Sequence, residues 1–590
     1  LERKNIMTNW NLEEVYKNEE EWNKDFSNFQ CLVKNIVSFE GKLNNLEAIE
    51  EYLAYEEKIS KLISKLYSYS HMKFDQNQKD LKSQELVNKV IKVIYELQSL
   101  SAFHNDEFLA LGYEKFEEYA KKSKIIKENL FNIKMLFDGR KHILAPVCEQ
   151  IVSNFGPVTN AFGNLYAALQ NSDFEPIDVS LTDGSKVKVS PNNYTSILAS
   201  LKKQEDRKAV FEAQYSYYDK HKNTLSSIYK GVVDANIANM KTRGYDNILA
   251  LFLDGEKIPT DVYTSLIQTA RENTAPLKRY IKIRQKYFNL PEYHTYDRML
   301  SFSNAKVAYP YEKAYTDVLK ALEPMGDDFV AHAKEALKDG HVDVFPTEAK
   351  RSGAYSTRIE GYGPYILLNH TDDLESAFTL AHECGHSIHT LYTIESQPFA
   401  TQDYRIFVAE IPSTLNEQLF LDYLLKNSNN KELKLQAVCK AVDNIVSTFY
   451  RQTLFADFEY QAHTKAINGE ELNYEVLSNI MANLYKEYYG IDLETEPLKK
   501  LVWAYIPHMY YSPFYVYQYA TCFSASMKIY EEIKNNKPNA MKNYLNMLKA
   551  GASLYPVDVV KLSGVDLTGK EPFEAVCNKL NELLDSLEDL

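Results

Sequence analysis

Apolar residues recur at helical spacing through the first part of the chain. Ile59, Leu62, Leu66 and Tyr69 fall on one face of a helix, because residues three and four apart are neighbours there. Similar spacing runs from about residue 11 to residue 149, among many charged residues. The pattern predicts long antiparallel helices that pack against one another.

Two segments interrupt the helical pattern. Residues 179–189 hold two short alternating runs around Asp183 and Gly184, which predicts a β-hairpin near 178–190. Residues 339–370 are punctuated by glycine and proline, and the apolar run 365–368 predicts a strand. Helical spacing then continues, with polar breaks at 427–431 and 535–539. We expect an N-terminal helical lobe, residues 1–200, which includes the hairpin, and a catalytic domain, residues 201–590.

Composition narrows the class of protein. The 590 residues include 20 glycines and 44 tyrosines, and 45% are hydrophobic, which suits a mainly α protein with a large core. The net charge of −14 argues against a nucleic-acid partner, because binding phosphates needs excess Lys and Arg. Six scattered cysteines without a CxxC pair indicate a reducing, cytoplasmic location. We find no signal peptide and no run of 18 apolar residues, so we expect no membrane partner.

The segment His382-Glu383-Cys384-Gly385-His386 carries the strongest chemical signal. Asp372 and Glu375 resemble a capping box, so a helix is expected to begin there and to place both histidines on one face. Two imidazoles one turn apart can bind one zinc ion, and the glutamate between them can act as general base. A bare His-Glu-x-x-His pattern arises by chance in roughly 1 in 50 chains of this kind, so its context matters.

A catalytic zinc site needs a third ligand. Glu410 follows His386 by 24 residues, enough for one helix to end and another to return. Glu417 stands two helical turns after Glu410. It either hydrogen-bonds one of the metal ligands without touching the metal, or it is a solvated acid. His389 also faces this side, but three ligands on one straight helix converge poorly, so we expect a packed or hydrogen-bonded histidine. Cys384 is expected to be a buried small residue.

Several longer segments resemble one known family. They are residues 350–356 (Lys-Arg-Ser-Gly-Ala-Tyr-Ser), 382–389 (His-Glu-Cys-Gly-His-Ser-Ile-His), 407–417 (Phe-Val-Ala-Glu-Ile-Pro-Ser-Thr-Leu-Asn-Glu), 506–511 (Ile-Pro-His-Met-Tyr-Tyr) and 514–519 (Phe-Tyr-Val-Tyr-Gln-Tyr). Together they resemble the M3 family of metallopeptidases, and within it the oligoendopeptidase F branch. The resemblance covers about residue 195 to the C-terminus well.

The resemblance implies a mainly α, two-lobed, zincin-type enzyme with a deep channel between the lobes and a small β element beside the active-site helix. It implies one Zn²⁺ per chain, held by His382, His386 and Glu410, with Glu383 as general base. It also implies a zinc-dependent endopeptidase that hydrolyses internal bonds of short oligopeptides through a zinc-bound water.

The aromatic segment near the C-terminus is the expected source of oxyanion donors. Ser512-Pro513 is a good helix start, which places His508, Tyr510 and Tyr511 on a loop and Tyr515 and Tyr517 on a helix. A peptidase needs donors aimed at the developing oxyanion, and tyrosine hydroxyls and a histidine can supply them. We expect this role of His508 and of Tyr517, then of Tyr515; an aromatic core is the alternative.

Substrate contacts are expected from Gly353, Ala354 and Tyr355, and from Tyr510 and Tyr511. An exposed edge of the 365–368 strand beside the zinc helix can pair with an extended peptide backbone. A purely structural hairpin is the alternative.

Two other functions remain open from the sequence. One is a zinc carboxypeptidase on a similar scaffold, which needs a cationic side chain for the substrate carboxylate, and the sequence assigns none. The other is a non-catalytic peptide-binding protein, which the presence of Glu383 disfavours.

Overall fold

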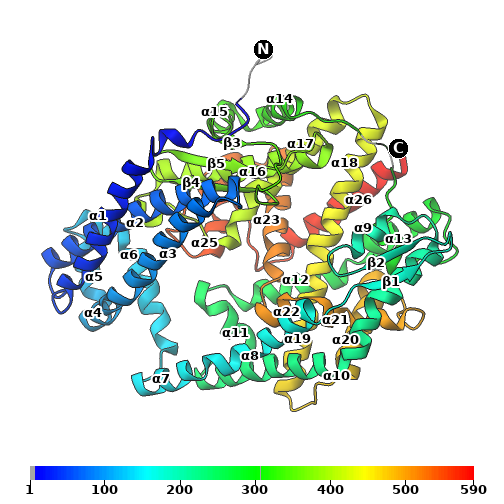
Figure 1. Ribbon diagram of the computed structural model, residues 1–590, viewed down its shortest axis with the longest axis horizontal. Coiled ribbons are helices and arrows are strands. Elements are labelled where there is room, and N and C mark those ends of the chain that lie inside the picture. Colours follow the sequence, from blue (N-terminus) through cyan, green and yellow to red (C-terminus); the bar gives the residue numbers. More distant parts are fainter. Residues whose placement is uncertain (1–6, 304, 306, 590) are drawn as a thin grey trace. The chain divides into compact units, whose positions relative to one another are not determined.

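The computed structural model describes residues 7–303, 305 and 307–589, and the described chain is mainly helical with two small sheets (Figure 1). It divides into two compact units, each assembled from separate stretches of sequence. Unit 1 comprises Leu1–Lys141, Lys306–Asn429 and Ile529–Val565, and unit 2 comprises His142–Ala305, Asn430–Lys528 and Asp566–Leu590. The predicted boundary at residue 200 differs from this interleaved division, so the lobe and the catalytic domain stay predictions as functional units.

The helices and strands of unit 1 are α1 (Glu19–Asn35), α2 (Leu46–Gln76), α3 (Leu81–Leu100), α4 (Phe103–Leu111), α5 (Tyr113–Ala120), α6 (Lys124–Gly139), α14 (Tyr311–Ala321), α15 (Asp327–Ala336), β3 (Val342–Asp343), β4 (Tyr355–Ile359), β5 (Gly363–Leu367), α16 (Leu374–Ser396), α17 (Ile406–Asn427), α24 (Ala540–Leu548) and α25 (Pro556–Lys561). Those of unit 2 are α7 (Pro146–Asn154), α8 (Gly156–Ala167), β1 (Ile177–Ser180), β2 (Lys186–Val189), α9 (Tyr194–Ser200), α10 (Gln204–Thr242), α11 (Ile248–Leu253), α12 (Thr260–Glu272), α13 (Ala275–Tyr287), α18 (Lys431–Asn444), α19 (Arg451–Ile467), α20 (Tyr474–Tyr489), α21 (Val502–Tyr505), α22 (His508–Tyr511) and α26 (Glu571–Asp589). Helix α23 (Tyr517–Lys534) begins in unit 2 and ends in unit 1.

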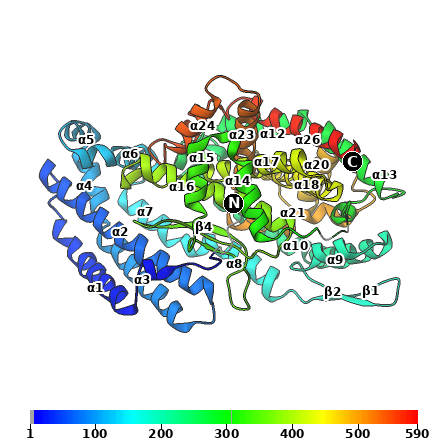
Figure 2. The ribbon, with the colours of Figure 1, turned by 90° about the horizontal axis from the view of Figure 1, so that it is seen from above.

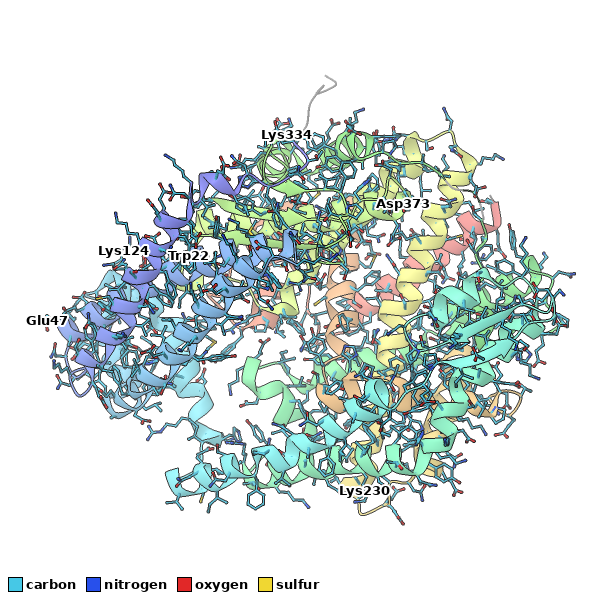
Figure 3. All side chains as sticks on the ribbon, viewed as in Figure 1. Trp22, Glu47, Lys124, Lys230, Lys334 and Asp373 are labelled. Atoms are coloured by element: carbon cyan, nitrogen blue, oxygen red, sulfur yellow. The ribbon has the colours of Figure 1, made fainter. Side chains whose placement is uncertain are left out.

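The N-terminal helices α1, α2 and α3 pack as the apolar spacing predicts (Figure 1). Ile59, Leu66 and Tyr69 are buried on one face of α2. Trp22 of α1 is fully buried beside α2, and its indole N–H donates to the Ser70 hydroxyl at 3.0 Å (Figure 3). Burial of this apolar face, rather than helix propensity alone, holds the bundle together.

A three-stranded sheet supports the predicted metal-binding helix α16. The strand order is β3-β5-β4, with β3 parallel and β4 antiparallel to β5. The predicted strand at 365–368 therefore forms, as β5, but it is the central strand, and the free edge belongs to β4. The expectation that 365–368 is an exposed edge is wrong because both of its sides are already paired. Helix α16 packs on both β5 and β4.

The last segment of unit 1 returns to α16 and α17, the two helices that carry the predicted metal ligands. Helix α24 contacts α16, and α25 contacts α17. The backbone N–H of Ala552 donates to the Thr401 carbonyl at 2.8 Å, and the Tyr530 hydroxyl bonds the Asp422 carboxylate. Residues 529–565 are thus part of the packing around α16 and α17, although they follow them by more than a hundred positions.

Unit 2 contains the predicted β-hairpin and the longest helix of the described chain. Strands β1 and β2 pair antiparallel from Ile177↔Val189 to Ser180↔Lys186, and Gly184 takes a left-handed φ of +86° in their turn (Figure 2). Only glycine adopts that conformation without strain.

The predicted helix breaks also occur, between α17 and α18 and between α23 and α24. Among the described residues, no helix is both long and apolar enough to cross a membrane.

Candidate metal centre

Helix α16 carries the His-Glu-x-x-His segment, and its first residue is set by Asp373. The Asp373 side chain accepts the backbone N–H of Ser376 at 2.8 Å, which satisfies one of the free donors at the helix start (Figure 3). The predicted cap of Asp372 with Glu375 is wrong by one residue. Asp372 instead takes a left-handed φ of +54°, which turns the chain into the helix.

Three side chains meet at one point in unit 1. One ligand atom each from His382, His386 and Glu410 lies within 4.8 Å of the others. The Nε2 atoms of the two histidines are 3.2 Å apart, and Glu410 Oε2 lies 3.2 Å from His382 Nε2 and 3.6 Å from His386 Nε2. Helix α16 supplies the histidines and α17 supplies the glutamate, so two packed helices build the cluster. Two imidazoles and one carboxylate match the protein ligands of a catalytic zinc site.

Further contacts hold the two imidazole rings in place. His382 Nδ1 lies 2.7 Å from Glu417 Oε1, two turns beyond Glu410 on α17. His386 bonds the backbone carbonyl of Ala409. Partners of this kind fix the orientation of a ligand histidine and direct its other nitrogen at the metal. Glu417 is only 14% exposed at its side chain, which excludes the alternative of a solvated acid.

The charges of the cluster are strongly coupled. Burial opposes protonation of His382, but hydrogen bonds to Glu410 and Glu417 hold its pKa well above the ordinary value. Burial, with the positive charge of His382, lowers the pKa of His386 to about 4. Burial disfavours the Glu410 carboxylate, but His382 and His386 bring its pKa down to about 2. Glu410 is therefore anionic at neutral pH, as a metal ligand must be.

Glu383 lies next to the cluster and is 6% exposed. Its carboxylate accepts a hydrogen bond from the backbone of Ser356 on β4, while Oε2 has no partner among the described residues. Burial raises the pKa of Glu383 to about 7, and the nearby His382 opposes this rise. A carboxylate with such a pKa can take up and release a proton near neutral pH.

His389 and Cys384 lie away from the ligand cluster. His389 is fully buried and stacks on Tyr404, with ring centroids 3.8 Å apart. Its two ring nitrogens have no partner among the described residues, and burial lowers its pKa to about 3. Cys384 is also fully buried, and burial raises the pKa of its thiol to about 12. The geometry thus places a neutral packed histidine and an unreactive thiol at these positions.

Gly385 lets α16 and α17 approach closely beside His382, His386 and Glu410, which we call the metal cluster. A Cβ atom at this position would lie 2.6 Å from the Pro412 carbonyl oxygen and 2.6 Å from Ser413 Cα. Asn416 of α17 also donates to the Ala381 carbonyl at 3.2 Å. The glycine of the motif therefore has a steric role that the sequence pattern alone does not reveal.

The aromatic segment near the C-terminus folds differently from the prediction. Helix α23 begins at Tyr517, so the predicted helix start at Ser512-Pro513 is wrong. Phe514 takes a left-handed φ of +57°, and its N–H donates to Glu459 Oε1 at 3.1 Å. This distant buried carboxyl group holds a turn where the local sequence favours a helix.

His508 lies on the short helix α22 rather than on a loop, and Tyr515 precedes α23 rather than lying on it. Both are partly exposed, and with Tyr519 they form a ring cluster in which centroids are 5.5 to 6.2 Å apart. Tyr517 is 1% exposed and packs on Tyr263, with centroids 5.0 Å apart. Of the two tyrosines predicted as oxyanion donors, Tyr515 is partly exposed and Tyr517 is buried.

The other predicted substrate-binding tyrosines divide in the same way. Tyr510 is buried and stacks on Tyr166 at 3.8 Å, so this residue belongs to the core of unit 2. Tyr511 is 50% exposed at the end of α22. Both lie on this helix and not on the predicted loop.

The predicted loop 353–355 lies in unit 1, at the start of the free edge strand. Gly353 and Ala354 precede β4, and Tyr355 is its first residue. Asn369 holds the loop by donating to the Gly353 carbonyl at 2.7 Å, and the Tyr355 hydroxyl donates to Asp75 at 2.8 Å. Tyr355 is thus tied to α2, which leaves the backbone of β4 as the feature that a peptide could pair with.

Comparison with known protein families identifies the chain. The model of Peptidase family M3 matches residues 197–579, and a model described as Oligopeptidase F matches residues 107–175. The chain belongs to peptidase family M3. It is therefore a metallopeptidase, and a hydrolase.

Curated M3 relatives match nearly the whole chain. Oligopeptidase PepF of Bacillus subtilis is 35% identical over 98% of this chain and 87% of its own length. An oligoendopeptidase F homolog of Borreliella burgdorferi is 32% identical over 98% of both chains.

Solved structures share the fold of this M3 peptidase. A Chlamydophila abortus protein superimposes with a TM-score of 0.92 at 30% identity, covering 99% of this chain and 98% of its own. Oligoendopeptidase-F from Enterococcus faecium gives 0.70 at 26% identity, with coverages of 97% and 99%. These matches confirm the predicted family and the mainly α fold.

The sequence did not reveal the supporting contacts of this M3 site. Ser356, Ala409 and Tyr404 contribute through backbone groups or stacking, which leave no residue-type signature. Ser387 on α16 pairs with the Ser356 hydroxyl at 2.8 Å and ties the helix to the edge strand.

Proposed function

We propose that this M3 peptidase is a zinc-dependent endopeptidase that hydrolyses internal bonds of short oligopeptides. The cluster of His382, His386 and Glu410, with the buried Glu383 beside it, carries the proposal. The names of the curated relatives, oligopeptidase and oligoendopeptidase, support the size class of substrate. Six free thiols also support a cytoplasmic location, as an inference.

The donor set fits zinc. Two imidazoles, which bind zinc in their neutral form, and one anionic carboxylate converge. Hydrogen bonds to Glu417 and to the Ala409 carbonyl orient the two rings. When bound, one zinc ion per chain would supply Lewis acidity, which polarises a carbonyl oxygen and makes water more acidic.

Glu383 is the proposed proton carrier. Its free Oε2 can accept a proton from the attacking water and return it to the departing amine, and a pKa of about 7 suits both directions. The backbone of Ser356, which bonds the same carboxylate, fixes its position relative to β4. An extended peptide that pairs with the β4 edge would be aligned by main-chain hydrogen bonds, without reading its sequence.

His508 and Tyr515 are the proposed donors to the developing oxyanion, because both are partly exposed and their rings lie together. Tyr511 stays a candidate substrate contact, as do the backbones of Gly353 and Ala354. Buried Tyr517 is proposed to support this segment from the core.

A peptide blocked at both ends and internally quenched tests the proposal. We expect cleavage that stops with a zinc chelator and returns with zinc, together with one zinc per chain by elemental analysis. A carboxypeptidase would leave this peptide intact but cleave a partner peptide with a free carboxyl terminus. Binding without cleavage of either peptide would support the non-catalytic alternative. Equal rates on a short peptide and on a folded protein that contains the same sequence would contradict the oligopeptide preference.

A further inference from the structure

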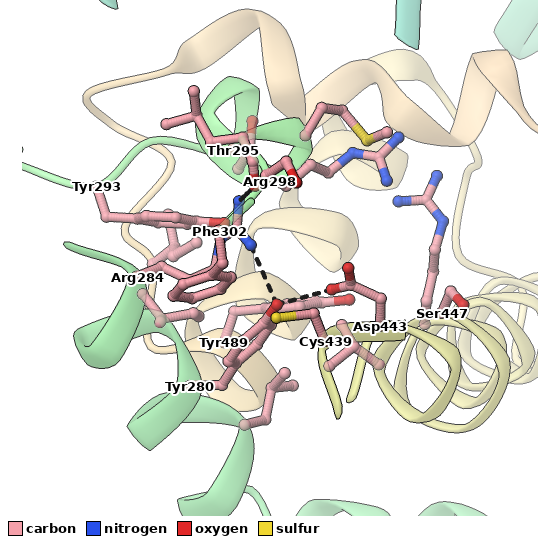
Figure 4. A pocket seen from close by; sticks show the side chains of 18 of the residues that line it. Tyr280, Arg284, Tyr293, Thr295, Arg298, Phe302, Cys439, Asp443, Ser447 and Tyr489 are labelled. Carbon is pink, nitrogen blue, oxygen red and sulfur yellow. Dashed lines mark hydrogen bonds between the residues drawn. The ribbon is translucent and has the colours of Figure 1, made fainter. Parts of the chain in front are cut away.

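Unit 2 contains a cavity of about 360 Å³ whose lining residues all belong to that unit, whereas the metal cluster belongs to unit 1 (Figure 4). Its walls come from α13, α18, the π-helical turn that follows α18, the start of α19, α20, and the segments 293–302 and 491–499. Pockets that hold small ligands begin at roughly 300 Å³. The cavity is therefore large enough for a small molecule, and none of the residues proposed for the peptidase site lines it.

Positive charge dominates the lining of this cavity. Arg284, Arg298, Arg451 and Lys499 line it, and Asp443 is the single carboxylate among its described lining residues. Burial lowers the pKa of Lys499 well below its ordinary value, and the nearby arginines act in the same direction. Even with a neutral Lys499, three guanidinium groups face one carboxylate.

Asp443 does not neutralise the arginines through a direct ion pair. It accepts the Tyr280 hydroxyl at 2.7 Å, and the same hydroxyl accepts Arg284 Nη1 at 3.1 Å (Figure 4). Arg284 also donates to the backbone carbonyls of Asp297 and Leu300 at 3.0 and 2.6 Å. The side chain is 2% exposed, and its Nε has no partner among the described residues.

The other cations are also without a carboxylate partner in the described part of the chain. Arg451 bonds the Tyr485 hydroxyl and lies over the Phe455 ring, with its guanidinium carbon 4.8 Å from the ring centroid. Lys499 donates to the Tyr215 hydroxyl at 2.9 Å. Arg298 has no ion pair there. Neutral groups thus position the Arg451 and Lys499 side chains without supplying an opposite charge.

The nearest additional acid is already engaged elsewhere. Glu496 is 3% exposed, and both its oxygens accept bonds from Thr295, including the hydroxyl at 2.6 Å. His294 Nδ1 lies 3.0 Å from the same carboxylate. Glu496 moderates the field at Lys499, but its carboxylate oxygens are already engaged by Thr295 and His294.

We propose that this cavity is a binding site for a small oxyanion, a phosphate- or carboxylate-bearing molecule, separate from the peptidase centre. Confined guanidinium groups that repel one another are costly unless an anion compensates them. Their planar donor forks match the oxygens of phosphate or carboxylate in two-point contacts. The rings of Tyr293, Tyr489 and Phe302 also line the cavity and can cover an apolar or aromatic body attached to the anion.

Titration of the full-length metal-loaded protein with defined anions tests the site. The probes are inorganic phosphate, pyrophosphate, citrate and adenosine 5′-monophosphate, each against sodium chloride at equal ionic strength. We expect saturable binding by calorimetry and a rise in the unfolding temperature that depends on probe concentration. Tighter binding of the nucleotide than of phosphate identifies an organic ligand, and the reverse order identifies free phosphate.

Three variants connect the binding to this cavity. Arg298→Gln and Arg451→Gln should each weaken it by roughly tenfold or more, because each loses a charge-assisted contact. Asp443→Asn should strengthen it, since the one negative charge disappears while the Tyr280 bond can remain. This gain also keeps the test informative if an arginine variant folds poorly. Arg279→Gln is the control, because Arg279 lies on α13, which also contributes to the cavity wall, but its side chain pairs with Asp585 and Glu588 and does not line the cavity.

The probe anions can also bind the zinc of the metal-loaded protein. The cavity variants therefore decide whether the observed binding occurs in the cavity. Binding that Arg298→Gln, Arg451→Gln and Asp443→Asn all leave unchanged would overturn the proposal. Stabilisation by chloride equal to that by every oxyanion would overturn it as well.

Discussion

Gly385→Ala tests whether close helix packing positions the third metal ligand. The added Cβ would lie 2.6 Å from the Pro412 oxygen and from Ser413 Cα, about 0.8 Å short of the 3.4 Å at which ordinary contact begins. Both are main-chain atoms of α17, so rotation of a side chain cannot relieve the overlap. Helix α17 must therefore move away from α16, and Glu410 moves with it.

The free-energy cost follows from two opposing effects. Overpacking a tight contact costs about 1–3 kcal/mol, and an unyielding backbone favours the upper end. Replacing a helical glycine by alanine returns about 1 kcal/mol of helix propensity. We expect the metal-free protein to lose about 1–2 kcal/mol of unfolding free energy.

Metal affinity should fall further than stability. Ligand distances in a metal site tolerate about 0.2 Å, and a shift several times larger at Glu410 weakens its contact. We expect zinc affinity to decrease by roughly 10- to 100-fold or more. Loss of the hydrogen bonds that support metal ligands has an effect of that size. Zinc content after dialysis against graded chelator, and urea unfolding of the metal-free protein, measure the two effects.

The matched control is Gly139→Ala, at the end of α6 in the same unit. A Cβ there meets nothing within 4 Å, so this variant should be neutral or slightly stabilised and should keep its zinc. A Gly385→Ala protein with wild-type stability and wild-type zinc affinity would refute the steric argument. A destabilised variant with unchanged affinity would show that this contact does not set the position of Glu410.

Other predictions address the proposed roles separately. Glu383→Gln should keep its zinc and lose roughly 10²–10⁴-fold in kcat, and activity within twofold of wild type would exclude the general base. Glu410→Ala should lose zinc on dialysis while His389→Ala retains it; the opposite result would reassign the third ligand. Tyr515→Phe should lower kcat by roughly 10²–10³-fold with KM nearly unchanged, and a rise in KM alone would make Tyr515 a substrate contact. Burial raises the pKa of Glu459 to about 8, so the folded protein holds this proton more tightly than the unfolded chain does. The unfolding free energy of the wild type should therefore fall as pH rises from about 4.5 through 8, by at most roughly 5 kcal/mol. Glu459→Gln should abolish that fall, and parallel curves of unfolding free energy against pH for the two proteins would contradict it.

The convergence of His382, His386 and Glu410 could be predicted because its signals are local. His382 and His386 stand one turn apart, and Glu410 and Glu417 stand two turns apart on the next helix, so helical periodicity alone places each pair on one face. The cap was misplaced by one residue because Asp372 and Asp373 are adjacent and both are good caps. Their backbone angles, which the rest of unit 1 determines, decide between them.

The aromatic segment could not be predicted because distant contacts determine it. Ser512-Pro513 has the local signature of a helix start, yet Phe514 adopts a left-handed turn whose N–H reaches Glu459, 55 positions earlier. The free sheet edge was misassigned for a similar reason, since the pairing partners of a strand depend on β3 and β4 together. Local patterns specify the elements, and long-range contacts specify which of their faces remain open.

The interleaved assembly of unit 1 has a consequence for biosynthesis. Both α16 and α17 have left the ribosome once residue 429 has emerged, but their packing partners α24 and α25 lie in the segment that ends at residue 565. At roughly 5–20 residues per second, those 136 residues take about 7–27 s to translate. During that interval the apolar surfaces of α16 and α17 that α24 and α25 cover stay open to chaperones, to proteases and to neighbouring nascent chains.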